Sequence, residues 1–290
     1  MYGALEAGGT KMVCAVGSED GKIYEQVSIP TLTPDETIPK ILDFFKDKNI
    51  AALGVASFGP VDPDPASPTF GYITTTPKPG WADYDLVGTL KSELNVPIGF
   101  DTDVNGSLLG EVTYGDSKGI SDAVYITIGT GVGGGVMTNG RLLHGMLHPE
   151  LGHMLMRPHH SDTYAGRCPF HKNCLEGMAA GPAIEDRWGA KGTALADRDE
   201  VWELEAYYIG QAIVNLILTL SPKKIILGGG VMHQEQLFPL VRKEVETQLN
   251  GYLKTPLLAD LDSYIVPASL NDDQGIMGCI KLAVDAYKMG

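Results

Sequence analysis

The sequence predicts an α/β protein with mixed sheets, arranged in two domains. Strand-like segments alternate with segments of helical periodicity along most of the chain. Two pairs of strands are instead joined by glycine-rich turns as hairpins, which adds antiparallel pairs to the parallel ones. With 290 residues, of which 43% are hydrophobic, the chain can form the cores of two domains.

Both hairpins have the same order of strand, glycine turn and strand. The first occupies residues 2–16, with its turn at 7–11, and the second occupies 123–138, with its turn at 129–134. Their similarity suggests two related half-chains, with coincidence as the alternative, because glycine turns between strands are common.

The remaining elements follow from periodicity and turn residues. Between the hairpins we expect a helix at 35–48, a buried strand at 51–57, a short helix near 85–94, a strand at 97–100 and a helix from 104 to about 113. After residue 176 we expect a long helix at 199–220, a strand at 223–227, and helices at 234–249 and 274–288. The segment 58–80, rich in Pro, Gly and Thr, is too long for an ordinary connection and is a candidate substrate loop.

The charge of the chain excludes some partners. Lys and Arg total 22 against 36 Asp and Glu, and the net charge of −14 repels nucleic-acid backbones and anionic membrane surfaces. The same charge repels ATP, so a nucleotide site would depend on backbone N–H groups, a few cations and a metal ion. The first residues lack a signal-peptide pattern, and the most apolar segment, 212–220, is too short for a membrane span. We therefore expect a cytoplasmic protein without nucleic-acid or membrane partners.

The second glycine turn must first be distinguished from a dinucleotide-binding motif. Gly129, Gly131 and Gly134 match the G-x-G-x-x-G spacing directly after a strand, and Glu150 lies at a suitable distance for the acidic partner. That motif requires a helix after the glycines. Here Asn139-Gly140 between apolar runs predicts a hairpin instead, which disfavours a dinucleotide fold.

A glycine turn inside a hairpin can still bind phosphate, because its backbone N–H groups converge on an anion without side-chain obstruction. One such turn alone would most simply close a hairpin, but two of them and a third glycine run after a strand favour nucleotide binding. Threonine hydroxyls and a lysine add donors and a cation. The predicted nucleotide-binding residues are Gly8, Gly9, Thr10, Lys11, Thr130, Gly131, Gly228, Gly229 and Gly230.

A cluster of soft ligands predicts a zinc site. Cys168, His171 and Cys174 lie at spacings short enough to bind one tetrahedral Zn²⁺. Four upstream histidines are candidates for the fourth ligand: His148, His153, His159 and His160. The alternatives are chance proximity in a loop and a disulfide, which a reducing compartment disfavours. Magnesium is expected separately, bridging ATP phosphates and carboxylates, with ligands that the sequence does not identify.

A longer pattern surrounds the second turn. Ile128–Gly135 is followed by Gly140, Gly145 and the element Glu150-Leu151-Gly152-His153. This pattern resembles the signature of the repressor/open-reading-frame/kinase (ROK) family of sugar kinases, within the actin/hexokinase/Hsp70 superfamily, and the resemblance extends over nearly the whole chain.

Three further segments, Glu6–Lys11, Thr76–Trp81 and Asp101–Gly106, are similar to the fructokinase branch of this family. The chain departs from many relatives at Glu6, where they carry Asp, and at Thr102, where they carry Asn. The second departure changes one expected sugar contact.

The resemblance implies an actin-like ATPase (ribonuclease H-like) fold with two lobes and a cleft between them. A small N-terminal lobe would cover 1–116, with the C-terminal helix, about 277–290, packing back on it, and a large lobe at 117–276 would carry the zinc-binding loop. ATP and sugar would meet in the cleft, and closure would exclude water. A homodimer is expected from the family alone.

The resemblance also assigns roles to single residues. Asp103 would be the general base that takes a proton from the sugar hydroxyl as its oxygen attacks the γ-phosphate. Its place between a strand and a helix equally suits a helix N-cap, and Asp101 is the local competitor for catalysis. The implied sugar-binding residues are Gly59, Pro60, Asn105, Glu150, His153 and Glu176. For Glu176 a solvated helix start is an equal alternative, and His153 would also be the fourth zinc ligand.

The expected reaction transfers a phosphoryl group from ATP to a hexose and gives hexose 6-phosphate and ADP. D-fructose is the first expected hexose. A kinase for mannose, glucose or an amino sugar is one alternative, because hexose epimers differ in one hydroxyl orientation. A non-catalytic sugar-sensing module is a weaker one, because the family's repressors carry a helix-turn-helix ahead of the sugar domain, whereas the first hairpin here starts at residue 2.

Overall fold

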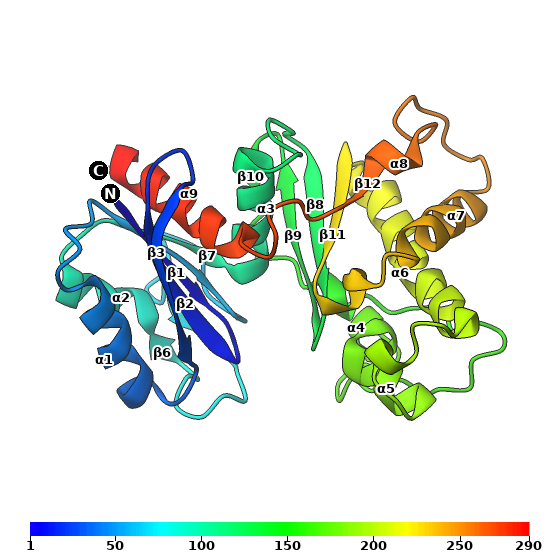
Figure 1. Ribbon diagram of the computed structural model, residues 1–290, viewed down its shortest axis with the longest axis horizontal. Helices are drawn as coiled ribbons and strands as arrows, with labels where there is room; N and C mark the ends of the chain where they lie inside the picture. Colours follow the sequence, from blue (N-terminus) through cyan, green and yellow to red (C-terminus); the bar gives the residue numbers. More distant parts are fainter. Residues whose placement is uncertain (290) are drawn as a thin grey trace. The chain divides into compact units, whose positions relative to one another are not determined.

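The computed structural model describes residues 1–289 and divides the chain into two compact units (Figure 1). The first unit contains Met1–Gly119, Leu142–Pro149 and the chain from Ser269 onward. The second contains Ile120–Arg141 and Glu150–Ala268. The lobe bounds expected from the sequence, 1–116 and 117–276, stay a prediction.

The first unit is built on a mixed five-stranded sheet of order β3-β2-β1-β4-β7. Its strands are β1 (Tyr2–Ala7), β2 (Lys11–Gly17), β3 (Ile23–Pro30), β4 (Leu53–Ser57) and β7 (Ile98–Thr102). β1 to β3 pair antiparallel, whereas β4 pairs parallel with both β1 and β7. The first predicted hairpin is therefore confirmed. The sequence did not reveal β3, because this edge strand is mostly exposed and lacks a run of buried apolar residues.

Helices cover both faces of this sheet (Figure 1). They are α1 (Pro34–Phe45) and α2 (Leu86–Leu94) on one face, and α3 (Asp103–Tyr114) and α9 (Gln274–Met289) on the other. Leu5, Ile41 and Leu90 share the core under α1 and α2. On the opposite face α3 and α9 cross in backbone contact, since a Cβ atom at Gly278 would collide with the carbonyl oxygen of Gly106.

The candidate substrate loop between β4 and α2 carries a small ribbon of its own. Its strands β5 (Tyr72–Ile73) and β6 (Tyr84–Asp85) pair antiparallel, and the Gly59–Pro60 peptide bond is cis. Trp81 is fully buried against this ribbon and donates its indole N–H to the carbonyl oxygen of Leu32 at 2.6 Å. The loop is thus an ordered part of the first unit.

The second unit repeats the hairpin-plus-parallel-strand arrangement. Its sheet, of order β10-β9-β8-β11-β12, contains β8 (Ala123–Ile128), β9 (Val132–Thr138), β10 (Arg141–Leu142), β11 (Lys224–Gly228) and β12 (Ile265–Pro267). β8 pairs antiparallel with β9 and parallel with β11, as β1 does with β2 and β4. The shared topology favours related half-chains over coincidence.

Helices and short 3₁₀ turns complete the second unit. They are η1 (Leu151–His153), α4 (Leu175–Ala179), α5 (Gly181–Trp188), η2 (Gly192–Ala194), α6 (Asp199–Leu220), η3 (Gly230–His233), α7 (Leu237–Leu249) and α8 (Leu261–Tyr264). The bounds of α6 agree with the predicted helix to the residue, because its apolar periodicity extends over the whole length. The sequence suggested a helix start at Glu176, which lies in the first turn of α4, but it did not give the bounds of α4 and α5, which are short.

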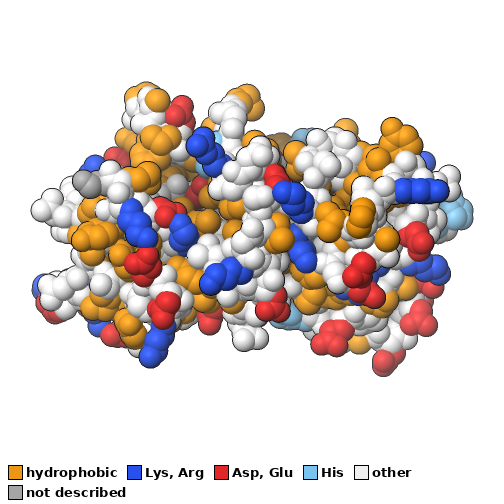
Figure 2. Space-filling model, turned by 90° about the horizontal axis from the view of Figure 1, so that it is seen from above, with side chains coloured by type: hydrophobic (Ala, Val, Ile, Leu, Met, Phe, Trp, Pro, Cys, Tyr) orange, Lys and Arg blue, Asp and Glu red, His pale blue; other side chains and the backbone are white. Residues whose placement is uncertain are grey.

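The surface is polar and mixed in sign. On the face drawn in Figure 2, Lys and Arg side chains lie among Asp and Glu side chains, so the negative net charge does not form one continuous acidic field there. Across residues 1–289, no helix combines the length and the apolar character that crossing a bilayer would require.

Candidate active site and metal centre

The predicted catalytic segment lies where β7 ends and α3 begins. Thr102 is the N-cap of α3, since its side-chain oxygen accepts the N–H of Asn105 at 3.1 Å. Asp103 is the first helical residue and is half-buried, and its Oδ1 accepts the N–H of Val104 at 2.9 Å. The capping function that the sequence allowed for Asp103 therefore belongs to Thr102.

Asp101, the competitor for catalysis, is 3% exposed and its carboxylate is already engaged. Its Oδ1 accepts the N–H of Thr102 at 2.8 Å and Nδ2 of Asn105 at 2.7 Å. The ring Nε2 of His144 lies 3.0 Å from its Oδ2. A buried carboxylate with these partners is poorly placed to take a substrate proton, which favours Asp103 as the base.

The first glycine turn joins β1 to β2 and has the geometry of a tight anion-binding loop. The N–H of Gly8 donates to the carbonyl oxygen of Lys11 at 3.0 Å, and a Cβ atom at Gly8 would come within 2.6 Å of that oxygen. Thr10 and Lys11 are exposed. A second cation, which the sequence did not single out, lies beside the turn: Lys78 Nζ is 3.8 Å from the Cβ position of Gly9. The one sequence feature that pointed to Lys78 was its location in the candidate substrate loop.

A half-buried carboxylate lies next to the catalytic segment. Desolvation, and after it the negative charge of Asp103, raise the pKa of Glu6 to about 7, against the opposing effect of Lys11. Asp272 and Asp273 add weaker contributions of the same sign as Asp103. Carboxylates gathered in this way suit a hard divalent cation such as Mg²⁺, which would favour their ionised forms.

The predicted sugar-pocket residues of the first unit lie close to this segment in the fold. Asn105 is 1% exposed and held by Asp101. The turn at Gly59–Pro60 follows β4, and the next residue, Val61, donates its N–H to Nε2 of His148 at 3.3 Å. His148 is therefore engaged in the first unit and is not part of the zinc cluster.

Glu176 contacts the second glycine turn. The Oε2 atom of Glu176 accepts the N–H of Val132 at 3.0 Å and lies 2.7 Å from the Cβ position of Gly131, so a larger residue at 131 would displace the Glu176 carboxylate. Glu176 lies in the first turn of α4. This contact was not foreseen, and the sugar-binding role of Glu176 stays a prediction. Glu150, the other predicted carboxylate of this unit, is exposed before η1.

A cavity of about 520 Å³ opens beside the same turn, a size typical of small-molecule sites. Among the predicted nucleotide-binding residues, Thr130, Gly229 and Gly230 line it. Residues that the sequence did not single out complete the lining, among them Pro182, Glu185, Lys191, Trp202 and Gln234. The glycines, small threonine and mixed polar rim suit a nucleotide.

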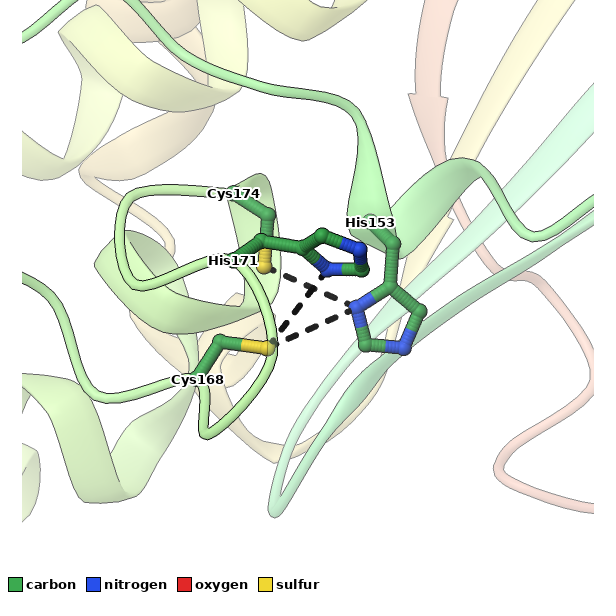
Figure 3. Close-up of side chains that lie close together, drawn as sticks. All are labelled: His153, Cys168, His171 and Cys174. Carbon is green, nitrogen blue, oxygen red and sulfur yellow. Dashed lines mark hydrogen bonds between the residues drawn. The ribbon is translucent and has the colours of Figure 1, made fainter.

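The four predicted zinc ligands converge in the second unit (Figure 3). Their ligand atoms all lie within 4.8 Å of one another. Nδ1 of His153 lies 3.8 Å from Sγ of Cys168 and 3.6 Å from Sγ of Cys174, and Nδ1 of His171 lies 3.7 Å from Sγ of Cys168. Tetrahedral Zn²⁺, with bonds of about 2.0–2.3 Å, places neighbouring ligands about 3.5 Å apart, so the set fits zinc with little adjustment.

Other contacts exclude two alternatives for this cluster. His159, offered by the sequence as a possible fourth ligand, instead contacts Ser161 through Nδ1 at 2.8 Å. Cys168 and Cys174 are both free thiols, so no disulfide joins them. Burial raises the pKa of Cys174 to about 11, and a bound cation would reverse that effect because zinc ligands are thiolates.

Comparisons with known proteins identify the family of this chain. The model of the ROK family matches residues 2–286. A fructokinase of Pediococcus pentosaceus is 48% identical over 288 residues, covering 99% of both chains, and a fructokinase of Streptococcus mutans is 46% identical over 289 residues, covering 98% of this chain and 97% of the relative.

Solved structures share the fold. The ROK hexokinase of Thermus thermophilus superposes with a TM-score of 0.80 at 24% identity, covering 100% of this chain and 99% of the other. A ROK glucokinase of Streptomyces griseus, solved with glucose and AMPPNP, gives 0.76 at 21% identity, covering 98% and 99%. The actin-like ATPase fold expected from the sequence is confirmed, and the chain belongs to the ROK family.

Proposed function

We infer that this chain is an ATP-dependent hexose kinase that converts D-fructose to fructose 6-phosphate. The observation that carries this inference is the group of relatives named fructokinase, 41–48% identical over nearly the full length of both chains. A relative named glucokinase is only 29% identical, which favours fructose over glucose. The hexokinase and glucokinase structures are too distant to assign the sugar.

In the first unit we assign Asp103 as general base and Asn105 with the Gly59–Pro60 turn as sugar-binding residues. Asp103 would receive the proton of the attacking hydroxyl at a carboxylate oxygen, while Asp101 keeps the Asn105 amide oriented. Gly8 would close the first glycine turn through its bond to Lys11. The N–H groups of Gly9 and Thr10 would bind phosphate, with Lys11 and Lys78 supplying positive charge.

We propose that Glu6 contributes a ligand to the magnesium ion that accompanies ATP, because it is a half-buried carboxylate that interacts electrostatically with three further acidic side chains. Asp103 keeps the role of general base. When bound, magnesium supplies positive charge to the phosphates and lowers the repulsion that the acidic chain presents to ATP.

In the second unit we propose that the nucleotide binds in the 520 Å³ cavity, which Thr130, Gly229 and Gly230 line. Gly131 and Gly228 do not line this cavity and are proposed to shape the two turns beside it. Glu150 and His153 are proposed sugar ligands. We further propose that His153, Cys168, His171 and Cys174 hold one structural zinc ion, with all four positions taken by protein and none left for chemistry.

A coupled assay of ADP release with a panel of sugars tests this function. Fructose should give the highest kcat/KM, and mannose, glucose and amino sugars should give less. Sugar binding without turnover on any member of the panel would favour a sensor. The fold does not decide this point, since a ROK transcriptional regulator also superposes with a TM-score of 0.79, although this chain spans only 78% of that protein. A cytoplasmic homodimer is proposed from the family and is testable by sedimentation.

A further inference from the structure

A short segment after β10 carries two histidines that the proposed reaction does not use. Residues Leu142–Pro149, which we call the histidine strap, belong to the first unit, although the chain on either side of them belongs to the second. Met146 at its tip is 97% exposed and Leu147 is 37% exposed. The strap is therefore fixed mainly by polar contacts and little by burial of these apolar side chains.

Two side-chain contacts of the strap fall on segments assigned to sugar phosphorylation. Nε2 of His148 accepts the N–H of Val61, and its ring lies 3.4 Å from the Cβ position of Gly59. Nε2 of His144 lies 3.0 Å from Oδ2 and 3.2 Å from Oδ1 of Asp101. His148 thus supports the turn at the beginning of the candidate substrate loop, and His144 supports the start of α3.

The contact with Asp101 has the larger consequence, because Asp101 organises the residues that follow it. Its side chain is 4% exposed and its Oδ1 already receives the N–H of Thr102 and Nδ2 of Asn105. His144 supplies the donor for Oδ2. Without it, a buried carboxylate would lose one partner, which is costly unless the carboxylate moves or takes up a proton.

The electrostatics of His144 agree with an ion pair. Its hydrogen bond to Asp101 raises the pKa of His144 above the usual value for histidine, although partial burial of the ring acts in the opposite direction. The side chain is 35% exposed, so the ring remains in contact with solvent while its Nε2 edge faces the carboxylate.

We propose that His144 is a positioning residue for phosphoryl transfer: through Asp101 it fixes the start of α3, on which Asp103 and Asn105 lie. The role rests on the proposed kinase function, since it concerns the geometry of the proposed base. Displacement of a reacting group by about 1 Å costs up to about a hundredfold in rate. His144 itself touches neither substrate nor phosphate in this proposal.

The test compares His144→Phe, which removes the donor, with His144→Gln, which keeps one. The matched control is Met146→Gln, which changes an exposed side chain of the same strap. We expect His144→Phe to lower kcat with fructose about 10- to 100-fold and to raise KM for fructose, with KM for ATP changed by less than about twofold. His144→Gln should recover most of the loss, and Met146→Gln should behave as wild type.

Two kinetic outcomes would overturn the proposal. Wild-type kinetics in His144→Phe would show that the contact between His144 and Asp101 does not contribute to catalysis. A loss as large as that of Asp103→Asn, not recovered by Gln, would make His144 a catalytic group instead.

The pair can also be tested without turnover. An NMR titration should show the pKa of His144 falling in Asp101→Asn, and no change would refute the pairing even if His144→Phe folds poorly. Failure of the wild-type protein to phosphorylate any sugar would instead count against the proposed function and would leave the titration result standing.

Discussion

At the scale of single residues, the first unit concentrates negative charge around the proposed reacting oxygen. Asp103, Asp272 and Asp273 all lie within electrostatic reach of Glu6, with Lys11 as the opposing charge. This negative charge would repel an anionic triphosphate unless positive charges lay nearby. Lys78 beside the glycine turn and a divalent cation at the carboxylates are the counter-charges that the arrangement calls for.

The proposed base can be removed with little change in shape. Asp103→Asn should keep sugar and nucleotide dissociation constants near wild type but lower kcat by about 10² to 10⁴, the usual contribution of a positioned base. Steady-state kinetics and calorimetric titration measure the two effects. Asp43→Asn, an exposed change on α1, serves as control. Full activity in Asp103→Asn would reassign the base.

Glu6 should make stability depend on pH. Its pKa is about 7 in the folded chain against 4.5 as the ordinary value, so between these pH values the unfolded state ionises while the folded state stays protonated. Stability therefore falls as pH rises from 4.5 to 7, by up to about 3 kcal/mol. Glu6→Gln removes this loss and should stabilise the metal-free protein more at pH 8 than at pH 5.

Urea unfolding in EDTA, without nucleotide, measures the effect of Glu6→Gln. The control is Glu93→Gln, at an exposed position on α2. Its free energy of unfolding should differ from that of wild type by the same amount at pH 5 and at pH 8. If the effect of Glu6→Gln on the free energy of unfolding is also the same at both pH values, the pKa of Glu6 is not raised in the folded protein. The same variant should lose kinase activity in the presence of magnesium, if Glu6 holds that ion.

At the scale of elements, two features depend on close approach. The loop between η1 and α4 is organised around the four soft ligands, and Cys174 doubles as the N-cap of α4 by accepting the N–H of Gly177 at 3.4 Å. The α3–α9 crossing depends on glycines in both helices. The metal ligands lie close enough in the sequence for their spacing to predict them, whereas the glycines of the helix crossing are far apart in sequence, so no local pattern reveals that contact.

The zinc proposal predicts about one zinc per chain in protein purified without added metal. Cys174→Ser should lose most of the metal and lower the melting temperature, because binding of a structural metal contributes to folding free energy. Cys14→Ala, at a buried thiol outside the cluster, should keep the zinc. Elemental analysis measures the zinc content of each protein. Wild-type protein that contains no zinc would refute the zinc proposal.

The helix crossing predicts the sign of Gly278→Ala. Helix propensity alone would favour alanine by about 1 kcal/mol. The added Cβ would meet the carbonyl oxygen of Gly106, and overpacking of this kind costs about 1–3 kcal/mol, so we expect net destabilisation. Because α3 begins at Asp103, kcat should fall as well. Thermal unfolding that matched or exceeded wild type would show that the helices adjust freely.

At the scale of the whole molecule, the sequence was informative wherever a signal was local. The bounds of α6 and the first hairpin followed from periodicity and glycine turns, and the Cys/His spacing led to the four converging ligands. The family resemblance, and not periodicity, drew attention to Asp103 and Asn105. Lys78 beside Gly9, His144 beside Asp101 and the exposed strand β3 were missed, because long-range packing alone reveals them.

The order of segments along the chain has one further consequence for synthesis. The first unit uses three separate stretches and the second uses two, so the polypeptide passes from one to the other four times. The last stretch supplies α9, which packs on β1 and β4, strands made at the very start. The second unit can therefore be completed only after Ala268 has been made, and the first only after α9, so a nascent chain stopped before Ser269 would have α3 alone on that face of its first sheet.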